Sequence, residues 1–114
     1  MLKSYLGKNV DVIIDRPLGS KHPKWDIYYT LNYGYIPNTI SGDGEEIDVY
    51  VIGKFEPIQT YNGTVVGIVD RKDDNEQKLV VCNEKDKYSI EQIVALVEFQ
   101  ERFFDSNIIM KENK

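Results

Sequence analysis

The stretch NYGYIPNTISGDGEEIDVYV, residues 32–51, decides how the rest of the chain is interpreted. Two turns marked by glycine and proline precede a run of β-branched and aromatic residues from Ile47 to Ile52, which predicts a strand. Four of the six residues from Asp43 to Asp48 are acidic. Carboxylates this close repel one another unless a cation lies among them, and such hard oxygen ligands suit Mg²⁺ or Mn²⁺. The stretch therefore predicts a metal site at the start of a strand.

Acidic loops that contain glycine are also common as solvated turns, and charge pattern alone does not separate the two interpretations. An EF-hand fits poorly, because the bidentate glutamate that closes such a loop would fall at Lys54. A metal site here therefore requires ligands from elsewhere in the chain.

Composition indicates one ordinary globular domain over residues 1–114, with 41% hydrophobic and 29% charged residues. No apolar run approaches the roughly 20 residues of a membrane span, and the first residues lack the apolar core of a signal peptide. We therefore expect a cytoplasmic protein without a membrane partner. The net charge of −5 argues against nucleic-acid binding, which needs a basic face. Cys82, the only cysteine, follows an apolar run and is expected to be a buried, inert thiol.

The pattern of apolar residues predicts five strands followed by one helix. Runs rich in Val, Ile and aromatic residues predict strands at 9–16, 26–35, 47–52, 63–70 and 79–83. Helical spacing and a capping box of Ser89 with Gln92 predict a helix from about Ser89 to Phe104. Its apolar positions, 90, 93, 94, 97 and 104, are expected to face the core. The fold class is α+β, mainly β: a small five-stranded OB-like barrel with a C-terminal helix.

Further polar residues lie where they can approach the acidic stretch. The basic loop at 19–25 contains Lys21, Lys24 and the only histidine, His22. A second acidic turn, residues 71–78, lies between two predicted strands, and two such turns on one small sheet can share an end. Tyrosines stand at 28, 29, 33 and 35. Phenol groups can donate to phosphate oxygens, but for Tyr28 and Tyr35 simple aromatic packing is the preferred explanation.

Two motifs in the stretch carry a resemblance to a known family. Residues 29–36 read YTLNYGYI, and residues 43–48 read DGEEID. From Val12 to about Phe104 the chain resembles the soluble family I inorganic pyrophosphatases, which share a Tyr-x-x-Asn-Tyr-Gly-Tyr-Ile segment followed by an Asp-x-Asp-x-x-Asp loop. The resemblance implies a five-stranded OB-like barrel that hydrolyses pyrophosphate to two phosphates with a metal-activated water. It also implies Mg²⁺ as the cofactor, with Mn²⁺ as an alternative, and we expect a homo-oligomer.

Position by position, the resemblance implies roles for individual residues of this chain. The implied metal ligands are Asp15, Asp26, Asp43, Asp48, Asp73 and Glu76. The implied catalytic residues are Glu45, Tyr33 and Lys78, with Glu45 where the family has the aspartate that helps deprotonate water. The implied substrate-binding residues are Lys24, Tyr29, Tyr33 and Lys78. Two residues are deleted in the second acidic turn, so Asp74 can substitute for Asp73 there.

The chain also departs from the family. It lacks the arginine that usually precedes the tyrosine motif, and it lacks a Tyr-Lys pair after Phe103 and Phe104. The alternative is therefore a degenerate member that binds metal or a phosphate compound without efficient catalysis. Strand alternation predicts that Arg16 points away from Asp15 and from the site. We accordingly expect Lys21, with His22, to supply the missing charge as a substrate-binding residue.

Overall fold

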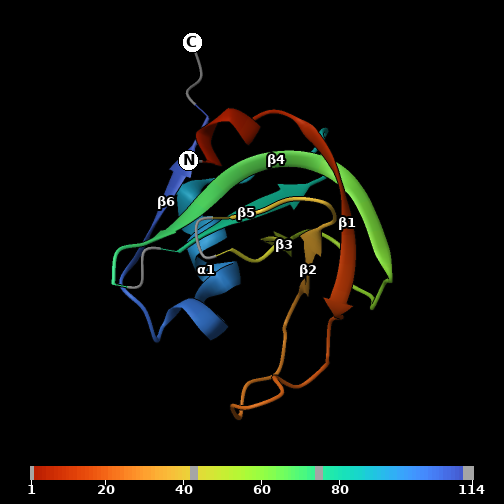
Figure 1. Ribbon diagram of the computed structural model, residues 1–114, viewed down its shortest axis with the longest axis vertical. Helices are drawn as coiled ribbons and strands as arrows, with labels where there is room; N and C mark the ends of the chain where they lie inside the picture. The colour runs from red at the N-terminus through yellow and green to blue at the C-terminus, as the bar shows by residue number, and fades with distance from the viewer. Residues whose placement is uncertain (1, 42–43, 74–75, 112–114) are drawn as a thin grey trace.

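The computed structural model describes residues 2–41, 44–73 and 76–111. Figure 1 shows the long strand β4 running across the molecule, with β1 beside one end and β6 beside the other. In chain order the elements are the 3₁₀ helix η1 (Leu2–Tyr5), β1 (Asn9–Arg16), β2 (Asn32–Ile36), β3 (Ile47–Val51), β4 (Thr60–Arg71), β5 (Gln77–Cys82), α1 (Ile90–Glu101) and β6 (Ser106–Met110).

The strands close into the predicted five-stranded barrel. Their order is β1-β2-β3-β5-β4-β6, and β1 also pairs with β4, which joins the two ends of the five-stranded set. Residues 60–64 of β4 pair with β1, whereas residues 67–71 pair with β6. The register of β4 against β5 shifts between Val65 and Gly67, where β4 changes partner. The sixth strand, β6, and the short 3₁₀ helix η1 are the elements that the sequence did not predict.

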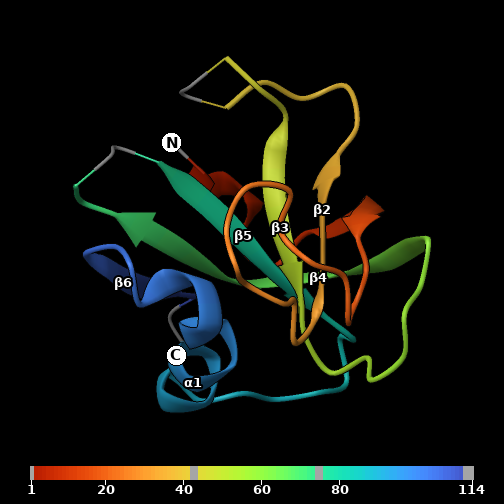
Figure 2. The same cartoon turned by 90° about the horizontal axis from the view of Figure 1, so that it is seen from below.

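Alternation along the strands divides the apolar residues between two cores. On β3, Val49 and Val51 point into the barrel, while Tyr50 points to the outer face. α1 covers that outer face and lies beside β5 and β6 in Figure 2. Cys82 belongs to this second core, and its burial confirms the prediction. Burial raises the pKa of the Cys82 thiol to about 11, so the thiol stays protonated at neutral pH.

The predicted helix begins as expected but presents a different face. Ser89 Oγ accepts a hydrogen bond from the Gln92 amide, and Gln92 Oε1 accepts one from the Ser89 amide, which confirms the capping box. Ile90 and Val94, predicted to be core, are 44% and 47% exposed. The face turned to the sheet runs instead from Ile93 and Val97 to two buried polar residues, Gln100 and Glu101. Helical periodicity is therefore correct, but the buried stripe continues through polar side chains.

The segment between β1 and β2 is a long loop rather than the start of a strand. It hangs below the barrel in Figure 1, contains only an isolated β-bridge between Lys21 and Tyr28, and β2 begins at Asn32. Tyr28 is 59% exposed in this loop, so the packing expected for it is wrong. The buried Asn32 carboxamide fixes the loop's return, because its Oδ1 accepts from the amides of Leu18 and Ile58. A Cβ at Gly34 would collide with the Ile13 carbonyl, which explains glycine there.

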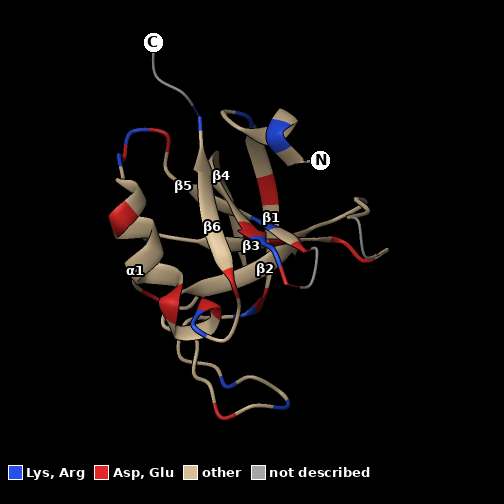
Figure 3. Cartoon of the chain, turned by 90° about the vertical axis from the view of Figure 1, so that its left-hand side faces the viewer, with Lys and Arg blue, Asp and Glu red and all other residues tan. Residues whose placement is uncertain are grey.

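Charged residues of both signs are interspersed along the described chain (Figure 3). The loop between β1 and β2, at the bottom of that view, carries both colours. Within the described residues, no helix is long and apolar enough to cross a membrane.

Candidate active site

One end of the barrel gathers charged side chains around a pocket of about 210 Å³. Among its described lining residues are three carboxylates and three permanent cations. This mixture suits an anionic ligand accompanied by a metal cation, because each needs counter-charges of opposite sign. The lining residues are Asp15, Arg16, His22, Trp25, Tyr33, Asp48, Arg71, Glu76, Lys78, Gln100 and Phe104.

Lys78 stands at the centre of this pocket. Its Nζ donates to Asp48 Oδ2 at 2.9 Å and to the Tyr33 hydroxyl at 2.5 Å, and it lies 2.5 Å from Glu76 Oε1. The parallel pairing of Val49 on β3 with Leu79 on β5 makes the preceding residues, Asp48 and Lys78, neighbours. The two acidic turns therefore share an end of the sheet, as predicted. The Lys78 side chain is only 4% exposed, so its charge acts with little screening by solvent.

Burial and neighbouring charges shift the pKa values of two groups in the pocket. Burial, reinforced by the negative charge of Asp48, raises the pKa of Tyr33 well above its ordinary value. Tyr33 is therefore a neutral phenol at neutral pH. Burial also raises the pKa of Asp15, and repulsion from Asp48 and Glu46 adds to it, while Arg16 opposes the shift. A cation bound near Asp15 would relieve this repulsion.

A β-bulge turns Arg16 into the pocket, so the prediction that it points away is wrong. Ile14 pairs with Gly34 and Arg16 with Tyr33, which leaves Asp15 as the extra residue. A bulge breaks the two-residue alternation of a strand, and Asp15 and Arg16 consequently both line the pocket.

Arg71 is a second cation of the pocket that the sequence did not indicate. Its Nε and Nη2 donate to the Glu101 carboxylate at 2.9 and 2.6 Å. Its guanidinium also lies 3.6 Å from the centroid of the Phe104 ring and 3.7 Å from Glu76. The signal that could have found it is the polar pair Gln100 and Glu101 in the helix stripe, because a buried carboxylate needs a partner.

The structure brings some of the predicted site residues together and leaves others apart. Asp15, Tyr33, Asp48, Glu76 and Lys78 line the pocket. Tyr29 is buried behind it, 1% exposed, with its hydroxyl accepting a hydrogen bond from Arg16. Asp43 lies outside the described residues.

The remaining predicted residues do not line the charged pocket. Lys21 and Asp26 lie on the exposed loop, 3.7 Å apart from Nζ to Oδ1. Lys24 and Asp73 are exposed, and Glu45 lines an open cavity with Glu46. Their predicted roles stay predictions, whereas His22 does line the pocket. Two arginines, Arg16 and Arg71, line the pocket, whereas Lys21 does not.

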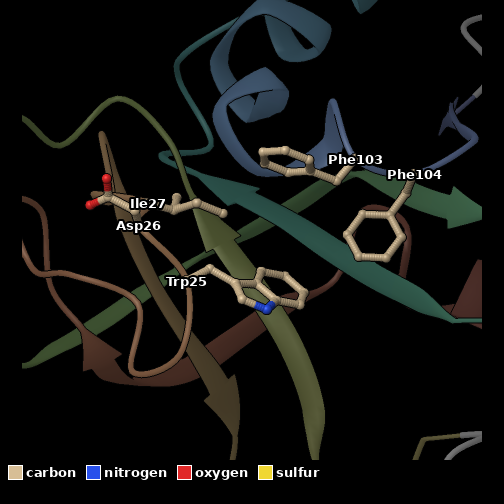
Figure 4. A pocket seen from close by; sticks show the side chains of 5 residues that line it. All are labelled: Trp25, Asp26, Ile27, Phe103 and Phe104. Carbon is tan, nitrogen blue, oxygen red and sulfur yellow. The ribbon is translucent and has the colours of Figure 1, made fainter.

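A larger apolar cavity, about 580 Å³, adjoins the charged pocket and shares Trp25 and Phe104 with it. Figure 4 shows the rings of Trp25, Phe103 and Phe104 around it, with the Asp26 carboxylate pointing away from the two phenylalanine rings. Its described lining contains no cation. Binding of a polyanion is therefore assigned to the smaller pocket.

The donors of the charged pocket suit a hard divalent ion only in part. Three carboxylates line it, and oxygen ligands are those that Mg²⁺ prefers. In the described ranges, however, no group of three or more His, Cys, Asp or Glu lies close enough to hold a metal. Lys78 bridges Asp48 and Glu76, and Asp43 and Asp74 fall outside those ranges. The described carboxylates thus fit as part of a metal site.

Sequence comparison with known proteins identifies the family of this chain. The model of the inorganic pyrophosphatase family matches residues 11–110. An inorganic pyrophosphatase of Xylella fastidiosa is 31% identical over 99 residues, covering 66% of this chain and 54% of that protein. One of Campylobacter jejuni is 28% identical over 118 residues, covering 90% and 64%. The chain thus spans between half and two thirds of the length of these relatives.

Solved structures agree on the fold. The inorganic pyrophosphatase of Ehrlichia chaffeensis superimposes with a TM-score of 0.72 at 21% identity, over 92% of this chain and 87% of that one. That of Coxiella burnetii gives a TM-score of 0.67 at 18% identity, over 95% and 88%. With the family match extending over nearly all of the barrel and α1, the chain belongs to the inorganic pyrophosphatase family.

Proposed function

We propose that the protein hydrolyses inorganic pyrophosphate to two phosphates with the help of a divalent metal ion. The observation that carries the proposal is the cluster around Lys78, in which one buried ammonium contacts Asp48, Glu76 and Tyr33. Hydrolysis of a phosphoanhydride is mainly a matter of neutralising charge and positioning water. Membership of the family supports this function over one in which the pocket binds phosphate without turnover.

The chain's own residues would divide the work between substrate and metal. The protonated phenol of Tyr33 would donate to a phosphate oxygen, and Lys78 would bind another in place of a carboxylate that the metal engages. Asp15, Asp48 and Glu76, with Asp43 from the acidic loop, would hold the metal. When bound, such an ion neutralises phosphate charge and lowers the pKa of a coordinated water. Glu45 remains the proposed group that takes the proton from that water, because the resemblance implies it.

The finer assignments are proposals as well. Mg²⁺, or Mn²⁺ in its place, is the ion that a carboxylate donor set favours. We also propose a cytoplasmic location, because the sequence shows no apolar run as long as a membrane span and no signal-peptide core. A homo-oligomeric state is proposed as well.

Changing Asp48 to asparagine is expected to weaken Mg²⁺ binding at least tenfold, about 1.4 kcal/mol, and to lower phosphate release from pyrophosphate. The reason is that Asp48 faces the pocket and its side chain is 34% exposed. It can therefore bind a metal ion while it also contacts Lys78. Calorimetry with Mg²⁺ and Mn²⁺ measures the affinity.

Asp11→Asn is the matched control, because Asp11 lies on the exposed side of β1 and accepts from Asn62. Unchanged affinity in Asp48→Asn would show that Asp48 is no metal ligand. A wild-type protein that releases no phosphate with either metal would remove the proposed function itself.

A further inference from the structure

We propose that Arg16 forms a phosphate subsite beside Tyr33, held in place by Tyr29 and Gln100; this proposal rests on the proposed function. The subsite would take one phosphoryl group of a diphosphate, while Lys78 takes the other. Three observations support it: the charge balance around Arg16, a directed hydrogen-bond chain behind it, and its place beside Tyr33.

Arg16 forms no direct ion pair in the pocket, unlike the other two cations, although the charge of Asp15 acts on it from a greater distance. Arg71 lies 2.6 Å from Glu101, and Lys78 lies 2.9 Å from Asp48. Among the described residues, no carboxylate lies within ion-pair distance of the Arg16 guanidinium, although its side chain is partly buried. A partly desolvated cation is costly without a partner. A bound anion would supply that partner.

A chain of hydrogen bonds fixes the orientation of this guanidinium. Arg16 Nη1 donates to the Tyr29 hydroxyl at 2.6 Å, and that hydroxyl donates to Gln100 Oε1 at 2.7 Å. Gln100 Nε2 then donates to the Tyr50 hydroxyl at 2.6 Å, which donates to Glu101 Oε2 at 2.6 Å. Each donor points the same way, from the cation Arg16 to the carboxylate of Glu101. Such chains polarise cooperatively and hold their members in one arrangement.

The hydrogen-bond chain leaves most N–H donors of Arg16 available to a ligand in the pocket. The bond to Tyr29 uses one of the five N–H donors of a guanidinium. Two parallel N–H groups match two phosphate oxygens, which is why arginine binds phosphate bidentately. Tyr29 is 1% exposed and does not line the pocket, and the amide of Gln100, 3% exposed, is engaged by Tyr29 and Tyr50, so both act through Arg16. They are positioning residues.

Arg16 and Lys78 both lie near the Tyr33 ring, and Lys78 also contacts its hydroxyl. The Arg16 guanidinium carbon lies 5.6 Å from the centroid of Tyr33, and Lys78 Nζ lies 5.2 Å from it. The two cations come from β1 and β5, on either side of β2 and β3 in the sheet. Two cations arranged around one phenol can bind the two ends of a single diphosphate, which a lone phosphate cannot span.

The test uses imidodiphosphate, a pyrophosphate analogue that is not hydrolysed, with Mg²⁺ in calorimetry, alongside phosphate-release kinetics with pyrophosphate. Arg16→Gln is expected to weaken imidodiphosphate binding and to raise KM at least tenfold, and Arg16→Lys is expected to recover part of the loss. Arg102→Gln is the matched control, because Arg102 is exposed and paired with Glu98. Thermal melting of each variant checks that it folds.

Tyr29→Phe tests the positioning chain, because it removes only the hydroxyl that joins Arg16 to Gln100. We expect KM to rise severalfold with kcat changed less than twofold. The double variant Arg16→Gln with Tyr29→Phe should bind imidodiphosphate no more weakly than Arg16→Gln alone, since Tyr29 acts through Arg16.

Imidodiphosphate affinity within twofold of wild type in Arg16→Gln would overturn the subsite, and additive losses in the double variant would overturn the positioning role. These outcomes are distinct from failure of the proposed function. If wild type releases no phosphate from pyrophosphate, the function fails, but the binding measurements still decide whether Arg16 is a phosphate subsite.

Discussion

Replacing Lys78 with methionine is expected to lower kcat/KM for pyrophosphate at least a hundredfold. Removal of one preorganised donor to charge that develops in the transition state typically costs about 3 to 4 kcal/mol. Lys78 is the proposed donor, and Asp48, Glu76 and Tyr33 hold its ammonium in one position at 4% exposure. Methionine keeps most of the side-chain volume. Steady-state phosphate release measures the effect.

Lys72→Met serves as the control, since Lys72 is an exposed residue beyond the end of β4. Lys78→Met also leaves Asp48 and Glu76 facing each other without the ammonium, so its melting temperature should fall in the absence of metal and recover partly with Mg²⁺. A kcat/KM within threefold of wild type would mean that Lys78 serves the fold and not the reaction.

Replacing Glu101 with alanine is expected to give the largest loss of stability, about 3–5 kcal/mol in the free energy of unfolding. The substitution leaves the Arg71 guanidinium, 5% exposed, without its bidentate partner. It also removes the acceptor of Tyr50 and Ser106. Urea denaturation measures the change. Glu98→Ala removes a similar ion pair on the exposed side of α1 and should cost no more than about 1 kcal/mol.

The same ion pair makes stability depend on pH in a definite direction. Burial alone would raise the pKa of Glu101, but hydrogen bonds from Arg71, Ser106 and Tyr50 outweigh it and hold the pKa below its ordinary value. The stabilisation is therefore complete above the unfolded-state pKa of about 4.3 and is lost as the pH falls through the lower folded-state pKa. Glu101→Gln should flatten this acid limb of the stability curve. Equal acid limbs in the two proteins would contradict the assignment.

The barrel was predictable from sequence because its strands follow simple periodicities. Alternating runs such as NVDVIIDR end at turn residues, and four of the five predicted strands lie within three residues of the predicted limits, the exception being 26–35, which is a strand only from Asn32. The proximity of Asp48 and Lys78 could also be predicted, because both acidic turns adjoin strands of the same sheet. Local pattern was sufficient wherever one face of an element is apolar and the other is polar.

Three features depended on tertiary structure that local pattern does not encode. The bulge at Asp15 reverses the direction of Arg16, and nothing in the run of Val and Ile marks it. β6 forms because residues 67–71 of β4, beyond the part that pairs with β1, offer a free backbone edge to which β6 pairs. The buried Glu101 is stable only opposite Arg71, a partner 30 residues away. Each therefore required knowledge of which elements meet.

The most direct measurement of the central claim is phosphate release from pyrophosphate by the wild-type protein, with Mg²⁺ and then with excess chelator. Charge neutralisation by metal is the main source of catalysis in the proposed site, so the account predicts release with Mg²⁺ and its loss on chelation. Release that persists at full rate in excess chelator, or its absence in Mg²⁺ and Mn²⁺ alike, would contradict the account.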